Sequence, residues 1–306
     1  MLLMLSGCAA HPLNDELPKT SAAQTEPTTT EPAPATEIAT EIITQSAAAL
    51  STTTILSTEP VPKPNVNARS ADSIQALAQA HLMDAPTEWG MAFDGITSRF
   101  EPTGKQLALT LDACGGPTGS GIDTALLDFL KREKIPATLF VSSRWVEQNR
   151  TLLQELSGNP LFSIQNHGNA HMPLSVTTRA AYGIPATGSV ERTMEEILAG
   201  ERVIQDITGT RTRFFRSGTA HYDDVSVRLL RELGYQTAGF SVNGDGGATF
   251  SAAQVTAALM ACRPGDIILC HMNRPDKPTG EGLQAALPAL IAQGYEFVRL
   301  DDVLPG

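Results

Sequence analysis

The sequence is short of positive charge, of cysteine and, over one long segment, of glycine and aromatic residues. Its 22 Lys and Arg residues stand against 33 Asp and Glu residues, for a formal net charge of −11. Nucleic acids and anionic lipids are bound by clustered positive charge, so this balance, without a long basic run, argues against either as the main partner. Hydrophobic residues make up 42% of the 306 positions, enough for a sizeable core in one large domain or two small ones.

Between Cys8 and Trp89 the chain contains no glycine and no Phe, Trp or Tyr. Thr, Pro, Ala, Ser and Glu dominate the first part of this segment, which cannot bury enough apolar surface to offset the entropy lost on ordering it. We therefore expect residues 9–70 to form a disordered, extended tether. A helical pattern follows, and we expect residues 71–104 to be an N-terminal extension that packs on a folded domain of residues 105–306.

The first eight residues combine an apolar stretch with small residues and a cysteine. The segment Leu5-Ser6-Gly7-Cys8 resembles the bacterial lipobox, whose cysteine becomes the lipidated first residue of the mature protein. The apolar stretch is shorter than the roughly 20 residues that span a bilayer. We expect residues 1–8 to be a lipoprotein-type signal remnant and Cys8 to anchor the chain to a membrane of the bacterial envelope, in the periplasm or at the surface. An apolar terminus without this role is the alternative.

Three further cysteines remain if Cys8 is lipidated, namely Cys114, Cys262 and Cys270. An odd number in an exported protein leaves at least one free thiol. Cys114 and Cys270 flank two candidate site residues, so a disulfide or a metal-binding role is conceivable if their strands are neighbours. Small buried cysteines that fill core space are the alternative.

From about residue 105 onward, short apolar runs alternate with longer amphipathic ones. The candidate strands are residues 106–111, 137–141, 162–165, 213–215, 237–242, 266–270 and 296–299. The candidate helices between them are residues 123–133, 144–157, 189–208, 223–233, 251–262 and 280–293. This alternation, with almost continuously apolar strands, predicts parallel strands buried on both faces, and seven strands favour a (β/α) barrel. In such folds function gathers in the loops that follow the carboxyl ends of the strands.

Two histidines, His167 and His171, follow one of these strands and are four residues apart. Imidazoles at that spacing can converge on one ion if the first turn after the strand is helical, and neutral imidazole is a common ligand of zinc and similar divalent ions. A pair of surface histidines is the alternative.

Asp112 ends another apolar run and enters a glycine-rich turn. A carboxylate there could deprotonate a metal-bound water or ligate the metal itself, whereas capping the next loop is the alternative. Arg216 follows two phenylalanines and could hold this carboxylate ionised through a charge-assisted hydrogen bond.

His271 follows a strongly strand-like run and could donate a proton to a leaving group. Asp245, in a glycine-rich segment, could orient that imidazole and raise its pKa. A glycine-rich turn that requires an aspartate explains Asp245 equally well.

Taken in order, these segments resemble the motifs of the polysaccharide deacetylases of carbohydrate esterase family 4. The family motif Thr-Phe-Asp-Asp-Gly is matched in part by Thr110-Leu111-Asp112-Ala113-Cys114, and His-Ser/Thr-x-x-His by His167-Gly168-Asn169-Ala170-His171. Arg-x-Pro-Tyr is reduced to Arg216-Ser217-Gly218-Thr219, and the motif with a paired Asp and a Trp to Asn243-Gly244-Asp245. Leu-x-His is matched by Leu269-Cys270-His271, and the likeness covers roughly residues 105 to 304.

This resemblance implies a distorted (β/α) barrel of about seven parallel strands that removes acetyl groups from a sugar with the help of a divalent metal ion, for which zinc is our expectation. It implies that Asp112 is the base, His271 the acid, and His167 and His171 metal ligands. Arg216 and Asp245 would support the base and the acid. The substrate would be an acetylated glycan.

The sequence departs from the family at Ala113, where a second aspartate completes the family's metal triad. Either Asp112 ligates directly, or Cys114 or another side chain substitutes, or two histidines and additional water hold the ion. The family's Tyr and Trp are also missing, and our candidates for substrate contacts are Thr219 and Tyr182, the latter in an extra loop of residues 179–188 beside the histidines.

Three functional hypotheses follow. The first is an active metal-dependent deacetylase of an envelope or environmental glycan. The second is a catalytically degenerate, glycan-binding envelope lipoprotein, favoured by Ala113 and the missing aromatic residues. The third keeps the hydrolase but replaces the glycan with a small amide or ester.

Overall fold

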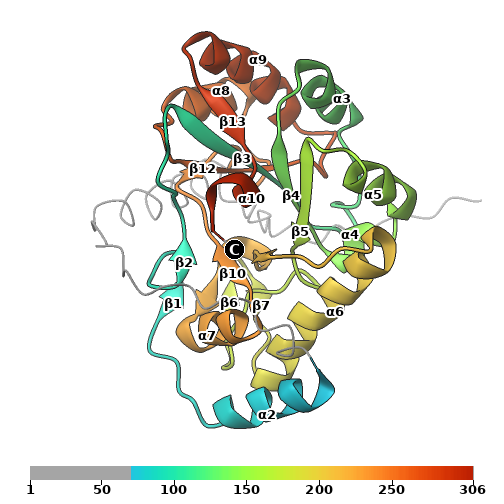
Figure 1. The fold of residues 1–306 in the computed structure, drawn as a ribbon, viewed down its shortest axis with the longest axis vertical. Helices are drawn as coiled ribbons and strands as arrows, with labels where there is room; N and C mark the ends of the chain where they lie inside the picture. The colour runs from blue at the N-terminus through green and yellow to red at the C-terminus, as the bar shows by residue number, and fades with distance from the viewer. Residues whose placement is uncertain (1–69, 306) are drawn as a thin grey trace, which may run out of the picture. The chain divides into compact units, whose positions relative to one another are not determined.

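Residues 70–305 are described by the computed structural model, and they form an α/β fold around one parallel sheet (Figure 1). The strand order is β11-β12-β3-β4-β5-β8-β10-β2, with β13 pairing with β3 as well, and every one of these pairs is parallel. The predicted α/β fold of parallel strands is therefore confirmed, as a sheet that curls into a half-barrel. The strands are β2 (Ile96–Thr97), β3 (Gln106–Ala113), β4 (Ala137–Val141), β5 (Phe162–Asn166), β8 (Phe214–Phe215), β10 (Gln236–Ala238), β11 (Val242–Asn243), β12 (Ile267–His271) and β13 (Glu296–Val298).

The apolar runs of the sequence form the interior of this sheet. Strand β3 lies between β12 and β4, and all but its first residue are buried. Side chains of β3, β4 and β12 pack with α3, α5, α8 and α9 in one apolar cluster. Burial on both faces explains why these strands have no polar alternation in the sequence.

The pattern over residues 237–242 predicted one strand, but the chain forms two, β10 and β11. At the end of β10 the carbonyl groups of Ala238 and Gly239 accept hydrogen bonds from the buried guanidinium of Arg216, at 3.3 and 2.8 Å. The chain leaves its partner β8 here and crosses to β12. A side chain remote in sequence therefore sets this break.

The predicted helices are present, with one division. They are α3 (Thr124–Glu133), α4 (Ser143–Val146), α5 (Arg150–Ser157), α6 (Val190–Thr208), α7 (Asp224–Glu232), α8 (Ala252–Met260) and α9 (Thr279–Ala292), followed by the short α10 (Leu300–Val303). The predicted helix of residues 144–157 is divided at Asn149, whose backbone is not helical and whose side-chain amide donates to the carbonyl groups of Trp145 and Ser120. The side chain competes with the main chain for helical hydrogen bonds.

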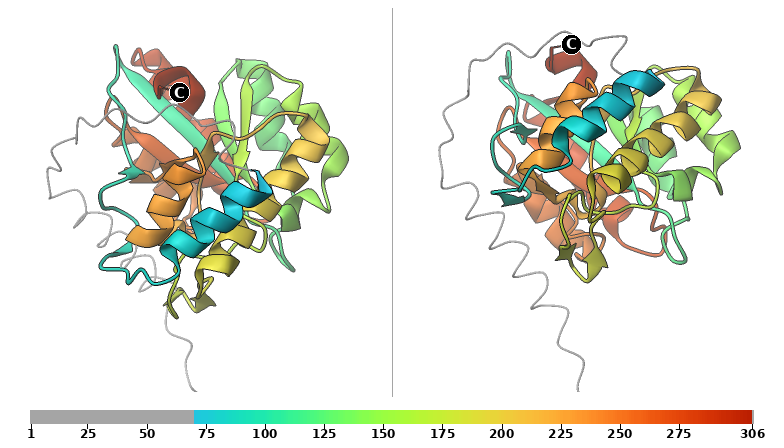
Figure 2. Two further views of the ribbon diagram at one scale, coloured as in Figure 1. Left: turned by 60° about the horizontal axis from the view of Figure 1, so that its bottom comes forward. Right: turned by 90° about the horizontal axis from the view of Figure 1, so that it is seen from below.

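The segment before residue 105 contributes three elements. Helix α2 (Ala71–His81) begins at the N-cap Ser70, lies alongside α6 and α7 (Figure 2), and adds Ile74, Leu77 and Ala78 to their apolar cluster. Strand β1 (Trp89–Gly90) pairs with β9 (Tyr222–Asp223) in an antiparallel manner, and β2 joins the edge of the main sheet beside β10.

The extra loop of residues 179–188 is a hairpin of β6 (Ala180–Ala181) and β7 (Ile184–Pro185). Its two-residue turn, Tyr182 and Gly183, has φ values of 50° and 75°. This is the pattern of a type I′ turn, which requires positive φ at both central residues.

The predicted lipidation site Cys8 and nearly all of the predicted tether lie outside the described residues. Cys114, Cys262 and Cys270 are all free thiols, so no disulfide joins the three. Within residues 70–305, no helix combines the length and apolarity needed to cross a bilayer.

Candidate active site and metal centre

The strand register brings the predicted site residues to one edge of the sheet. His271, the last residue of β12, pairs with Asp112 of β3. His167 and Arg216 directly follow β5 and β8, which are paired at their last residues. Parallel strands end at the same edge, so residues up to 159 positions apart in the chain meet there.

Arg216 is fully buried and holds Asp112 by a hydrogen-bonded ion pair. Its Nη1 donates to Asp112 Oδ1 and to Thr110 Oγ1, each at 2.8 Å. Its guanidinium also lies 4.3 Å from the centre of the Phe140 ring. Burial by itself would raise the pKa of Asp112, but the charges of Arg216, His167 and His271 outweigh it and lower that pKa below its ordinary value. Asp112 is therefore a carboxylate at neutral pH.

Three potential ligand atoms lie together beside this carboxylate. They belong to Cys114, His167 and His171, and all are within 4.8 Å of one another. His167 Nδ1 donates to the carbonyl oxygen of Arg216 at 2.8 Å, so Nε2 is the ring nitrogen that can ligate a metal ion once its proton is lost. That Nε2 is 3.8 Å from Cys114 Sγ and 3.7 Å from Asp112 Oδ2. The donor set of one thiol and two imidazoles suits zinc.

Ala113 takes no part in this cluster because its side chain lies in the apolar core. Neighbouring side chains on a strand point to opposite faces, and Cys114, one residue further, returns to the side of the histidines. Burial would raise the pKa of Cys114, but the nearby imidazoles of His171, His271 and His167 lower it well below its ordinary value. A thiolate is the form that binds metal.

His271 is held by Asp245. From the sequence, Asp245 could either orient this imidazole or serve a glycine-rich turn. Asp245 is fully buried and accepts hydrogen bonds from the backbone N–H of His271 at 2.8 Å, from its Nδ1 at 3.0 Å and from Thr279 Oγ1 at 3.1 Å. Burial would lower the pKa of His271, but the charges of Asp245 and Cys114 raise it well above its ordinary value. The imidazole is therefore protonated at neutral pH, with Nδ1 committed to Asp245.

Glu196 is a residue of the site that the sequence patterns did not reveal. It lies on α6, is 4% exposed, and accepts hydrogen bonds from the backbone N–H groups of Ala170 and Met172, on either side of His171. His171 itself has a φ of 59°, an uncommon conformation for a residue other than glycine. Glu196 thus fixes the loop that presents this imidazole. An acidic residue within the buried stripe of a helix was its one sequence signal, and α6 has a second such residue in Glu201.

Thr219 and Tyr182, the predicted substrate contacts, lie beside the cluster rather than in it. Gly218 packs so closely that a Cβ there would be 2.2 Å from the carbonyl oxygen of His171. The next residue, Thr219, has a φ of 65°, and its buried hydroxyl has no hydrogen-bond partner within residues 70–305. Tyr182, which is 50% exposed, packs edge-on against the ring of His221 at 5.4 Å between centroids.

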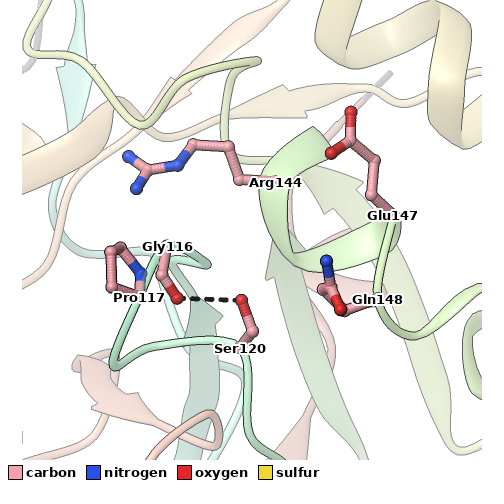
Figure 3. Close-up of a pocket in the computed structure, with 6 residues that line it drawn as sticks. All are labelled: Gly116, Pro117, Ser120, Arg144, Glu147 and Gln148. Atoms are coloured by element: carbon pink, nitrogen blue, oxygen red, sulfur yellow. Dashed lines mark hydrogen bonds between the residues drawn. The ribbon is translucent and has the colours of Figure 1, made fainter.

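An open depression adjoins the loop that follows Cys114. Figure 3 shows it between Gly116, Pro117 and Ser120 on one side and Arg144 on the other. Arg144 passes over Gly116, and its Nη1 donates to the carbonyl oxygen of Ala170 at 3.0 Å. This exposed cation therefore lies between the depression and the histidine loop.

Residues 100–238 match the family model described as polysaccharide deacetylase. The chain contains a polysaccharide deacetylase domain. A peptidoglycan-N-acetylglucosamine deacetylase of Listeria monocytogenes is 30% identical over 203 residues, which are 66% of this chain and 39% of that protein. The chain thus matches about two fifths of the length of that curated relative.

Two solved structures of the same family illustrate its range. A family 4 acetyl xylan esterase from Clostridium thermocellum, in complex with a cobalt ion, is 27% identical, with a TM-score of 0.53 over 65% of this chain and 89% of that one. A protein of Bacillus anthracis described as a family 4 pseudoenzyme is 20% identical, with a TM-score of 0.57 over 71% and 70% of the two chains. At that identity the second likeness shows the fold alone.

Proposed function

We propose that this protein is a metal-dependent deacetylase that hydrolyses acetyl groups on a glycan of the bacterial cell envelope. The observation that carries the proposal is one strand edge with a carboxylate kept ionised, an imidazole kept protonated and a Cys-His-His cluster between them. The peptidoglycan deacetylase of Listeria supports an acetylated envelope glycan as substrate. An extracytoplasmic position, with Cys8 lipidated, is part of the proposal.

Cys114, His167 and His171 would hold the metal ion, with zinc favoured by the sulfur and nitrogen donors. When bound, the ion would polarise the acetyl carbonyl group and stabilise the negative charge that develops on its oxygen. Asp112 is the weaker candidate for third ligand because its Oδ1 is committed to Arg216. Cys114 thus takes over the role that Ala113 cannot fill.

Asp112 would act as the base. Its Oδ2 is free of the ion pair with Arg216, lies 3.7 Å from His167 Nε2, and can take the proton of the water that attacks the acetyl carbon. His271 would act as the acid, because Asp245 holds its Nδ1 and leaves Nε2–H to protonate the leaving nitrogen or oxygen. Acetate and the deacetylated sugar are the products. Proton exchange with solvent then returns Asp112 to the carboxylate and His271 to the protonated imidazole.

The test uses the full chain with Cys8→Ser, so that the thiol of Cys8 cannot contribute to metal binding. The protein is stripped with a chelator, reloaded with Zn²⁺ or Co²⁺, and assayed for acetate release from N-acetylated chito-oligosaccharides, peptidoglycan and acetylated xylan. We expect one metal ion per chain, and for Co²⁺ a near-ultraviolet sulfur-to-metal charge-transfer band that Cys114→Ser abolishes. Cys262→Ser, a buried cysteine away from the cluster, is the matched control and keeps the band.

Three results would contradict parts of this proposal. A charge-transfer band that survives Cys114→Ser would remove Cys114 as a ligand and return Asp112 as the candidate. If acetate is released from none of the glycans but glycan binding is retained, the result would favour the second hypothesis, a catalytically degenerate glycan-binding protein, for which Ala113 is the sequence evidence. Activity on p-nitrophenyl acetate alone would favour a small ester or amide substrate.

A further inference from the structure

Three aromatic side chains from separate segments meet beside the histidine loop. Trp89 comes from β1, Tyr182 from the tip of the β6–β7 hairpin, and His221 from the chain just before β9. The rings of Trp89 and His221 are 5.6 Å apart at 43°, and those of Tyr182 and His221 are 5.4 Å apart at 88°. The guanidinium of Arg179 lies 5.6 Å from the centre of the Trp89 ring. We call Trp89, Tyr182 and His221 the aromatic cluster.

The aromatic cluster lies at the surface rather than in the core. His221 is 9% exposed and forms its floor, Trp89 is partly exposed, and Tyr182 is 50% exposed. Tyr182 also occupies a turn position with a φ of 50°, where glycine or asparagine is favoured. Burial of apolar surface therefore does not account for a tyrosine at this place.

The aromatic cluster is close to the candidate metal ligands. The backbone N–H of Leu174, three residues after His171, donates to the carbonyl oxygen of His221 at 3.0 Å. Gly218, three residues before His221, packs on the carbonyl oxygen of His171. Three residues of chain span at most about 11 Å. Each link therefore keeps His221 of the aromatic cluster and His171 within about the length of a short oligosaccharide of each other.

Polar groups surround the rings. His221 Nδ1 donates to the carbonyl oxygen of Thr219 at 2.8 Å, which leaves Nε2 as an acceptor. The buried hydroxyl of Thr219 has no partner within the described part of the chain. Thr219 and Ala220 have φ values of 65° and 55°, an uncommon conformation for residues other than glycine. Aromatic faces bordered by a few hydrogen-bonding groups suit a ligand that has apolar faces and hydroxyl groups at its edge.

We propose that the aromatic cluster is a subsite that binds a pyranose ring of the glycan next to the sugar being deacetylated. The substrate class rests on the proposed function. The N-terminal extension would then complete the substrate site through Trp89, which precedes the segment of residues 100–238 that matches the family. Trp89 and Tyr182 supply aromatic surface that Thr219 and the fourth motif of this sequence lack.

The test exploits the presence of just two tryptophans in the chain. Trp145 is fully buried, so iodide quenching in the wild-type protein reports on Trp89. The full chain, stripped of metal to prevent turnover, is titrated with N-acetylated chito-oligosaccharides of increasing length. We expect saturable protection of Trp89 from iodide, with affinity that rises with length. Calorimetry should show about tenfold weaker binding for Trp89→Ala, a smaller loss for Trp89→Phe, and weaker binding for Tyr182→Ala.

Met83→Ala is the control, since Met83 is 90% exposed in the same extension but is not in the aromatic cluster. With metal restored, Trp89→Ala should raise KM for oligosaccharides more than KM for a single acetylated sugar, whereas Met83→Ala should leave both KM values unchanged. Saturable, Trp89-dependent binding without acetate release would uphold the subsite while the proposed function fails. Acetate release with wild-type KM and affinity in Trp89→Ala would overturn the subsite while the proposed function stands.

Discussion

Removal of the Arg216 guanidinium should leave a buried, unpaired charge under the active site. In Arg216→Met the aliphatic part of the side chain is retained, but Asp112, whose side chain is 4% exposed, loses its cationic partner. Truncation of one partner of a buried ion pair costs about 3–5 kcal/mol. For a domain of this size that corresponds to a decrease in Tm of about 6–20 °C, at about 2–4 °C per kcal/mol.

Arg228→Met is the matched control. Arg228 likewise forms ion pairs with aspartates, here Asp84 and Asp224, but its side chain is 36% exposed. Such a surface ion pair contributes about 0–1 kcal/mol to stability. Urea unfolding of the full chain, in chelator to remove any contribution from metal, compares the two variants. A second change, Asp112→Asn in the Arg216→Met background, should recover part of the loss, with a coupling energy of about 0.5–3 kcal/mol.

The pH dependence gives a further check. The pKa of Asp112 is lowered in the folded protein, so its ionisation contributes stability above its ordinary pKa of 3.8, and that stability is lost as pH falls through the folded value. Without Arg216, burial raises that pKa instead. The stability deficit of Arg216→Met relative to wild type should therefore be largest at neutral pH and shrink as the pH is lowered. An equal deficit in both arginine variants, or one independent of pH, would refute this account of the ion pair.

Two other predictions concern the groups around the proposed metal. Because the charge of Asp245 helps to raise the pKa of His271, Asp245→Asn should move the alkaline limb of the kcat/KM profile for acetate release to lower pH, whereas the exposed Asp276→Asn should leave it in place. Because Glu196 accepts both N–H groups that flank His171, Glu196→Gln should weaken Zn²⁺ binding by about 10–100-fold in a competitive chelator titration. Glu201→Gln, an equally buried change on the same helix, should leave Zn²⁺ affinity unchanged, and equal affinity losses in both variants would assign Glu196 a general structural role.

Local patterns in the sequence determined the elements of this protein. Continuous apolar runs identified most strands of the main sheet, although not β2 or the division between β10 and β11, and amphipathic periods with caps such as Ser189 and Ser251 identified the helices. The order of Asp112, His167, Arg216 and His271 along the chain is enough to indicate the resemblance to the deacetylase family. These signals are local because helix and strand preferences depend on neighbouring residues.

Only the tertiary structure decided which side chains meet. The sequence left Cys114 and Asp112 equal as third ligands, whereas the path of the chain after β3 brings Cys114 to the histidines and Arg216 takes one oxygen of Asp112. Contacts between Asp245 and His271, Glu196 and the histidine loop, and Trp89 and His221 likewise join distant segments. Such contacts depend on strand register, sheet curl and loop path, which are set by the packing of the whole domain and leave no periodic trace in the sequence.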